Sequence, residues 1–191
     1  MPSPPEAQSA AAAGLCLACG LCCSGVLFKQ ATARAEEFEA MEKVGLETFD
    51  TGEKGYFKLP CDKLDGCRCT IYETRFRICR TFSCALLDKL KRGEATATEA
   101  QHVVAEAKAM LDRADAVDER LRFVDRRMEL QKAGPFGGAS SPQERAQAAK
   151  AYVHMAALER YLDRHFRREG AGMFSYDSLA GEAEAADTPS D

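Results

Sequence analysis

The segment CLACGLCC, from Cys16 to Cys23, places four cysteines within eight residues near the start of the chain. Cys16, Cys19 and Cys22 are each separated by two residues. Gly20 lies inside this run and permits the tight backbone path along which three thiolates can converge on one metal. Cys23 follows Cys22 directly, and neighbouring side chains of an extended chain diverge. The segment predicts a metal site in which Cys22 and Cys23 either serve different metals or include one bystander.

A second block of cysteines lies in CDKLDGCRCTIYETRFRICRTFSC, residues 61–84. Neither block contains the pair of CxxC knuckles that is typical of a zinc ribbon, so the second block has to fold back onto the first to complete a four-coordinate site. All nine cysteines lie between Cys16 and Cys84. Because cysteines that act only as small buried hydrophobes would be scattered through the core, this clustering favours metal ligation.

The composition excludes several other classes of function. The 191 residues carry a net charge of -4, with 26 basic and 30 acidic residues, which gives no positive field to attract nucleic acid. No apolar run reaches the roughly 18 residues of a membrane-spanning helix, and the start lacks the basic region of a signal peptide. We therefore expect no nucleic acid partner, no membrane partner and a cytoplasmic location, where thiols stay reduced and disulfides are not expected.

Hydrophobic patterning predicts an α+β fold that is mostly α. A small, irregular, cysteine-rich metal module with short strands is expected at 14–95, followed at 96–170 by a long helical hairpin packed on the module. The ends of the chain are rich in Pro, Ala, Ser, Asp and Glu, and such segments bury too little apolar surface to become ordered. The sequence therefore predicts disordered tails at 1–13 and 171–191.

Short elements are predicted around the cysteines. Runs of β-branched and aromatic residues predict strands at Val26–Lys29, Tyr56–Leu59 and Thr70–Tyr72. Thr32 is a typical N-cap for a helix that ends at Gly45, where glycine favours a C-terminal cap.

Three further helices are predicted downstream. The first covers Ser83–Arg92. The second, Thr98–Met128, begins with a capping box and carries apolar residues at spacings of three and four, and the third, Ser141–Phe166, has a similar stripe. The last two stripes predict a helical hairpin, although such a stripe is also typical of a homodimer seam or of a surface for another protein partner.

Both cysteine blocks resemble the YkgJ-like family, or CxxCxxCC family, of zinc- or iron-chelating domains over about Gly14–Lys132. The second block of that family typically reads C, a few residues, then GxC(S/T)IYExRPxxCRxF, and this chain departs from it at Phe76, where the family has proline. The resemblance implies metal ligation by the recurring cysteines Cys16, Cys19, Cys22, Cys23, Cys61, Cys69 and Cys79, together with Cys84, which matches a cysteine found in part of the family. It leaves Cys67 as a spare.

The spacing does not select the metal. Thiolate sulfur suits both zinc and an iron-sulfur cluster. Eight thiolates suffice for two four-coordinate centres, or for one centre with free, redox-active cysteines. Arg80 follows Cys79 and matches the CR pair of the family, so we expect it to contact the cofactor and to offset the charge of the thiolates.

Three uses of such a site are compatible with these residues. The first is a metal-binding protein whose fold depends on its metal. The family is also similar to the cysteine-rich part of flagellin lysine N-methylases, which implies an iron-sulfur or thiol-dependent enzyme related to protein lysine methylation or redox chemistry. A protein that delivers or senses metal would use the same ligands at a more exposed site.

Overall fold

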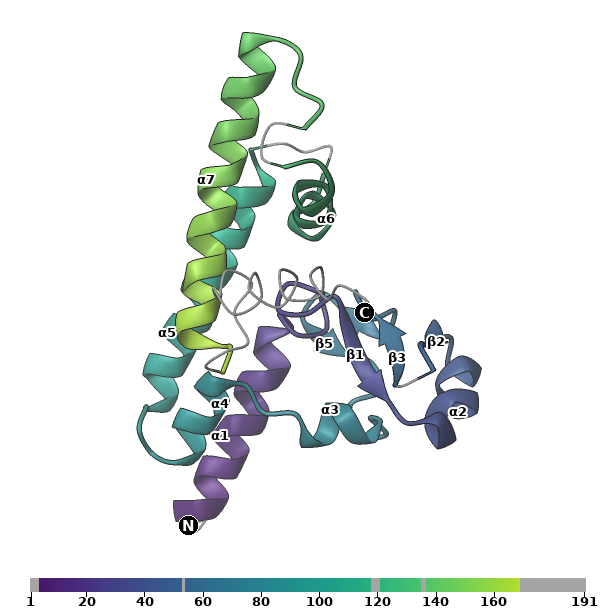
Figure 1. Cartoon of the computed structure of the whole chain (residues 1–191). Helices are drawn as coiled ribbons and strands as arrows, with labels where there is room; N and C mark the ends of the chain where they lie inside the picture. The colour runs from purple at the N-terminus through teal and green to yellow at the C-terminus, as the bar shows by residue number, and fades with distance from the viewer. Residues whose placement is uncertain (1–3, 53, 118–120, 135–136, 169–191) are drawn as a thin grey trace, which may run out of the picture.

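The computed structural model describes residues 4–52, 54–117, 121–134 and 137–168. Figure 1 shows helices along one side of the molecule and a small sheet on the other. The helices are α1 (Pro4–Cys19), the 3-10 helix η1 (Ala35–Glu37), α2 (Phe38–Lys43), α3 (Arg77–Thr81), α4 (Ala85–Lys91), α5 (Ala97–Asp115), α6 (Phe123–Ala133) and α7 (Pro142–His165). The strands are β1 (Gln30–Ala33), β2 (Thr48–Asp50), β3 (Gly55–Lys58), β4 (Leu64–Asp65) and β5 (Arg68–Cys69). The predicted α+β class, mostly α, is confirmed.

The larger sheet is antiparallel, with strands in the order β1-β3-β2. Its central strand β3 overlaps the predicted strand Tyr56–Leu59. Strand β1 begins just after the predicted strand Val26–Lys29. The reason is that Val26 and Leu27, which suggested a strand, are buried in the main hydrophobic core instead.

The remaining short elements also differ from the prediction. Strands β4 and β5 form a separate two-stranded ladder that pairs Leu64 with Cys69, whereas residues 70–72 form turns and a bend rather than a strand. The helix expected from Thr32 to Gly45 is shorter and consists of η1 and α2. Gly45 follows it with a φ of +79°, which agrees with its predicted role at the helix end.

Helix α1 covers much of the segment that was expected to be a disordered tail, 1–13. Its alanine-rich sequence favours a helix, and Ala12 and Leu15 are buried in the main core with 4% and 6% exposure. Helix α1 contacts α4 and α5, and composition alone does not reveal such packing. The other predicted tail, 171–191, lies outside the described residues.

Helices α5 and α7 pack side by side as a helical hairpin (Figure 1). Apolar residues on the two helices enter the main core, among them Val104, Ala107, Met155, Leu158 and Leu162. Helix α7 starts as predicted, because the hydroxyl of Ser141 accepts a hydrogen bond from the N–H of Glu144 in a capping box. In α5 the capping residue is Thr96 rather than Thr98.

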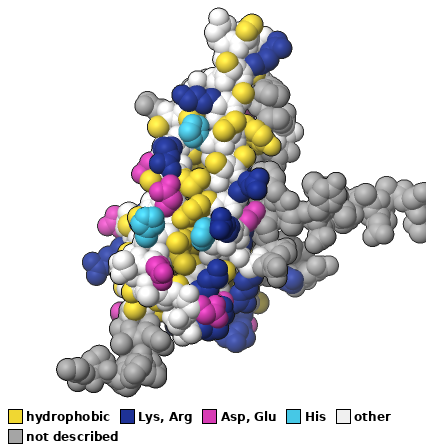
Figure 2. Space-filling view, turned by 90° about the vertical axis from the view of Figure 1, so that its left-hand side faces the viewer, with side chains coloured by type: hydrophobic (Ala, Val, Ile, Leu, Met, Phe, Trp, Pro, Cys, Tyr) yellow, Lys and Arg dark blue, Asp and Glu magenta, His cyan; other side chains and the backbone are white. Residues whose placement is uncertain are grey.

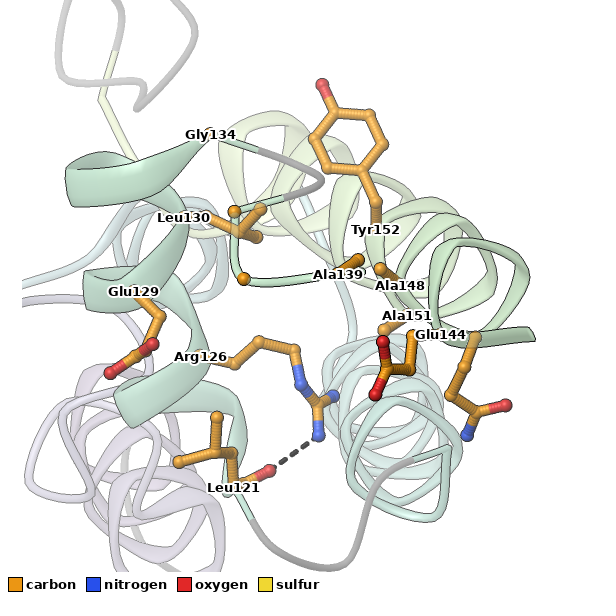
Figure 3. A pocket seen from close by; sticks show the side chains of 13 residues that line it. Leu121, Arg126, Glu129, Leu130, Gly134, Ala139, Glu144, Ala148, Ala151 and Tyr152 are labelled. Carbon is orange, nitrogen blue, oxygen red and sulfur yellow. Dashed lines mark hydrogen bonds between the residues drawn. The ribbon is translucent and has the colours of Figure 1, made fainter. Parts of the chain in front are cut away.

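The periodicity predicts a single helix through Met128, but the structure divides this stretch into α5 and α6. A carboxylate oxygen of Asp115 accepts a hydrogen bond from the N–H of Phe123. Arg126 donates to the carbonyl oxygens of Ala114 and Leu121, both at 2.6 Å, and Figure 3 shows the bond to Leu121. The N–H of Phe123 and the carbonyl of Ala114 are backbone groups that helix ends leave free. Because these contacts satisfy them, the chain can break here although the apolar stripe continues past it.

A cavity of about 400 Å³ lies between α6 and α7 (Figure 3). Two of the charged groups that line it already have partners. Arg126 donates to backbone carbonyls, and Glu144 accepts from the N–H groups of Ser140 and Ser141. The residues that line this cavity include no cysteine, so the predicted metal chemistry lies elsewhere in the described chain.

Glu159 of α7 is completely buried. Its carboxylate forms ion pairs with Arg127 of α6 at 2.5 Å and with Arg167, just beyond α7, at 2.7 Å. Arg167 also pairs with Asp163 at 2.5 Å. Buried charges are tolerated when they are paired and hydrogen-bonded. Glu159 is paired with two arginines and its Oε2 accepts a hydrogen bond from Arg167, whereas Oε1 of Glu159 and Nε of Arg127 have no hydrogen-bond partner among the described residues.

The same two arginines hold the backbone that follows the first cysteine block. Arg127 donates to the carbonyl oxygens of Gly25, at 3.3 Å, and of Val26. Arg167 donates to the carbonyl oxygen of Leu27 at 3.2 Å. Buried polar contacts therefore fasten the C-terminal helices to the cysteine-rich module.

Figure 2 shows the helical side of the molecule, where hydrophobic side chains form a band among basic and acidic ones. On α7, Val153 is 64% exposed and Tyr152 is 38% exposed. A protein partner or a homodimer through the hairpin stays a prediction. Among the described helices, none is both long enough and apolar enough to cross a membrane.

Replacing Glu159 with Gln removes the buried negative charge and keeps the shape of the side chain. We expect the free energy of unfolding to fall by about 3 to 5 kcal/mol, because Arg127 then stays buried without an acidic partner. Urea denaturation followed by circular dichroism measures this change. In the matched control Glu106→Gln, the lost ion pair with Arg113 is exposed and is worth about 1 kcal/mol or less. Equal losses in the two variants would contradict a stabilising role for the buried network.

Candidate metal centre

The first cysteine block is divided between the end of α1 and the turn that follows it. Cys16 and Cys19 belong to the last turns of α1 and, three residues apart, lie on the same side of the helix. Gly20 follows with a φ of +70°, which glycine adopts without steric cost and which ends the helix. The next turn carries Cys22 and Cys23. The predicted cysteine loop is therefore partly helical.

The second block folds back onto the first at two backbone contacts. A Cβ atom added to Gly20 would lie 2.9 Å from both Cα and Cβ of Cys67, so this approach requires glycine. The N–H of Cys61 donates to the carbonyl oxygen of Cys23 at 2.7 Å. These contacts provide the closure that a shared site requires.

Cys84 reaches the first block from the start of α4. It is the N-cap of that helix, and its Sγ accepts a hydrogen bond from the N–H of Leu87 at 3.4 Å. The next N–H, of Ala85, donates to the carbonyl oxygen of Phe166 at 3.0 Å. Helix α4 also packs on α1, so the end of α7 and the side of α1 together position Cys84.

Cys61, Cys69 and Cys79 approach from the side of the sheets. Cys69 in β5 pairs with Leu64 of β4, and the N–H of Leu64 donates to the carbonyl oxygen of Cys61 at 3.0 Å. Cys61 and Cys79 pack against the small core under the larger sheet. Together with Cys23, the three cysteines line a mostly apolar cavity of about 290 Å³.

Burial raises the pKa of several cysteine thiols, and neighbouring thiols raise it further. The thiols with a raised pKa are Cys16, Cys19, Cys22, Cys23, Cys61, Cys79 and Cys84. The pKa rises from 9.0 to about 11 for Cys19 and Cys79 and to about 12 for Cys23. Burial also raises the pKa of Cys22 well above its ordinary value. Without metal these thiols are protonated at neutral pH, so a metal has to displace their protons in order to bind.

The guanidinium of Arg75 lies near thiols from both blocks, whereas contact of Arg80 with the cofactor stays a prediction. Burial raises the pKa of Cys16 and Cys79, and the charge of Arg75 partly offsets that effect. The guanidinium of Arg75 lies 3.4 Å from the ring centre of Tyr72. Arg80 is exposed, and it donates to the carbonyl oxygen of Arg75. The spacing places both arginines near Cys79 but does not reveal which of them faces the thiols.

Lys108 of α5 contacts both blocks and was not predicted as a site residue. Its Nζ lies 3.2 Å from Sγ of Cys67 and 2.5 Å from the carbonyl oxygen of Ala18. Burial raises the pKa of Cys19, and the charge of Lys108 opposes that rise. No motif in the sequence connects this lysine with the cysteines, because only the packing of α5 brings it there. The hydrogen bond also gives Cys67 a partner of its own.

The predicted ligands are neighbours, but their side chains have not converged. Within the described ranges, no three His, Cys, Asp or Glu side chains are arranged to hold a metal ion as they stand. Coordination therefore requires the thiols to turn about their Cα–Cβ bonds toward a common point, a change between staggered rotamers. The donor set fits the expected groups, since sulfur is the preferred ligand of zinc and of iron-sulfur clusters.

The raised thiol pKa values predict that the metal-free protein loses stability at alkaline pH. Unfolded thiols ionise near 9.0, whereas Cys19 and Cys23 keep their protons in the folded state up to about 11 and about 12. Because the folded state then binds more protons, the free energy of unfolding should fall as the pH rises above about 9. Urea denaturation with a reductant and a chelator, at about pH 8 and about pH 10.5, measures the fall.

The double variant Cys19→Ser/Cys79→Ser provides the control for this measurement. It lacks two of the thiols with raised pKa values, so its stability should fall less between the two pH values. A wild-type stability that stays level or increases with pH would contradict the assignment.

Comparison with known protein families agrees with the donor set. Residues 15–108 match the sequence model of the CxxCxxCC family, described as "putative zinc- or iron-chelating domain". No curated protein and no solved structure matches the chain, so the similarity to flagellin lysine N-methylases stays a prediction. The match contains all nine cysteines and ends within α5. Over residues 15–108, the chain belongs to the CxxCxxCC family of zinc- or iron-chelating domains.

Proposed function

We propose that the protein binds zinc or an iron-sulfur cluster through thiolates from both blocks, namely Cys16, Cys19, Cys22, Cys23, Cys61, Cys69, Cys79 and Cys84. The closure of the two blocks is the observation that supports this most directly. The N–H of Cys61 donates to the carbonyl oxygen of Cys23 at 2.7 Å, and the backbone of Cys67 lies against Gly20. Thiols that are distant in the sequence thereby become neighbours.

The donor atoms favour a thiophilic metal. Magnesium and calcium prefer carboxylate and carbonyl oxygens, and the nearby Asp62 and Asp65 are exposed. Zinc takes four thiolates in closed tetrahedral sites, and iron-sulfur clusters are also held by four cysteines. Either group would use the same side chains here.

The location of the thiols supports a structural role for the metal. They lie where α1, α4 and the two sheets meet, between the main core and the small core. In small modules a structural zinc supplies about 10 to 16 kcal/mol of apparent binding free energy, whereas typical domains have a net stability of about 5 to 15 kcal/mol. A metal at this junction would therefore join the sheets to the helices.

A cytoplasmic location also belongs to the proposal. All nine cysteines are free thiols. The cytosol keeps thiols reduced and available to a metal, whereas oxidising compartments convert them to disulfides.

Protein purified anaerobically should contain zinc or iron in a simple ratio to the chain, as measured by elemental analysis. A brown protein with visible absorbance indicates iron-sulfur, and a colourless protein that contains zinc indicates zinc. The variant Cys69→Ser should lose metal, whereas the matched variant Cys67→Ser should retain it, because Cys67 is already paired with Lys108. Wild-type protein that contains neither metal would overturn the proposal.

The variant Gly20→Ala tests the closure of the two blocks. The added Cβ would lie 2.9 Å from the backbone of Cys67, and the φ of +70° also disfavours alanine by about 1 to 2 kcal/mol. We expect the metal content to fall several-fold. Gly66→Ala is the matched control, since Gly66 has a φ of +57° but no atom within 4 Å of an added Cβ. Retention of metal by Gly20→Ala at the level of Gly66→Ala would show that the contact is not required.

A further inference from the structure

We infer that the eight cysteines form two separate four-thiolate centres rather than one site with spare thiols. The helix centre consists of Cys16, Cys19, Cys22 and Cys84. The sheet centre consists of Cys23, Cys61, Cys69 and Cys79. This inference rests on the proposed function and deepens it by assigning each ligand to a centre.

The helix centre lies against the main hydrophobic core. Cys19, Cys22 and Cys84 all pack on that core. They come from the end of α1, from the turn after it and from the N-cap of α4, and α1 and α4 contact each other. Cys19 and Cys84 do not line the cavity at the sheets, whereas Cys16 and Cys22 do.

The sheet centre belongs to the opposite side of the junction. Cys61 and Cys79 pack on the small core rather than the main one. Hydrogen bonds join Cys23 to Cys61 and Cys61 to Leu64, the residue paired with Cys69 in the β4-β5 ladder. The same four cysteines line the cavity of about 290 Å³, and Cys16, Cys22 and Cys67 line it too, so the cavity lies where the two centres meet. Two independent features, core packing and backbone hydrogen bonds, thus give the same division.

The division passes between the adjacent residues Cys22 and Cys23. The electrostatic neighbours agree with it: among the thiols that raise the pKa of Cys22, after burial, Cys84 and Cys19 act most strongly. For Cys23 the corresponding thiols, again after burial, are Cys61 and Cys79. Adjacent side chains diverge in this way when the chain between them is not helical.

Cys16 has neighbours in both centres, as does Cys22 through the adjacent Cys23. Cys16 affects the pKa of Cys19, Cys22 and Cys84, and it also interacts with Cys69. We assign it to the helix centre, because it lies three residues before Cys19 on the same side of α1. The two centres are therefore close neighbours. Arg75, which faces Cys16 and Cys79, lies where it offsets charge from both.

Cobalt(II) is a suitable probe, because its visible absorption reports a tetrahedral sulfur site. Titration of the metal-free, reduced full-length protein with Co²⁺ alone should end at two equivalents per chain. The variants Cys19→Ser/Cys84→Ser and Cys61→Ser/Cys79→Ser each damage one centre and should bind one equivalent. The variant Cys19→Ser/Cys61→Ser removes the same number of thiols but damages both centres, so its tetrahedral signal should be lost. Circular dichroism checks that each variant folds.

A second measurement on wild-type protein does not depend on the folding of variants. After addition of one equivalent of Zn²⁺, alkylation with N-ethylmaleimide and peptide mapping should show protection of the cysteines in sets of four, as assigned above. Wild-type protein that binds only one equivalent of Co²⁺ would overturn the division, as would protection that mixes the two sets. Equal Co²⁺ binding by the within-centre and cross-centre variants would overturn it too. Wild-type protein that binds no Co²⁺ and is purified with neither zinc nor iron would instead contradict the proposed function itself.

Discussion

One buried carboxylate, that of Glu159, sets the main constraint on this structure. An ionised side chain in the core has to be neutralised, and Arg127 of α6 and Arg167, just beyond α7, supply the opposite charges. The arginines in turn need acceptors, which they find in the backbone carbonyl oxygens of residues 25–27. The two arginines that pair with Glu159 of α7 therefore also hold the backbone of residues 25–27, directly after the first cysteine block.

Local signals in the sequence predicted the elements that depend on local interactions. Helix α7 begins where expected, because a capping box is formed within four residues around Ser141. The helix over Pro4–Cys19 was missed, since its stability comes from the burial of residues such as Ala12 and Leu15 against distant helices. The division of α5 from α6 was missed for a similar reason. Arg126 satisfies backbone carbonyls at the break, and hydrophobic periodicity carries no information on such contacts.

The candidate site also depends on tertiary contacts that the sequence could not predict. Cysteine spacing predicted that two blocks would meet, and they do so at Gly20 and Cys67. Spacing could not predict which cation faces the thiols, because that depends on how each side chain leaves the backbone. Arg75 stacks on Tyr72 beside the thiols, whereas Arg80 is exposed. Lys108 arrives on a helix beyond both blocks, so only the tertiary fold could identify it.

The hydrogen bonds from α6 and α7 to the cysteine module have a consequence for modularity. The segment that defines the family, 15–108, contains every cysteine, but it does not contain the groups that hold the backbone around Cys22, Cys23 and Cys84. Those groups are Arg127, Arg167 and the carbonyl of Phe166. Excised or grafted alone, the family segment would expose Val26 and Leu27 and lose this support. The family segment 15–108 is therefore too short to be transplanted on its own, because residues beyond it hold part of its backbone.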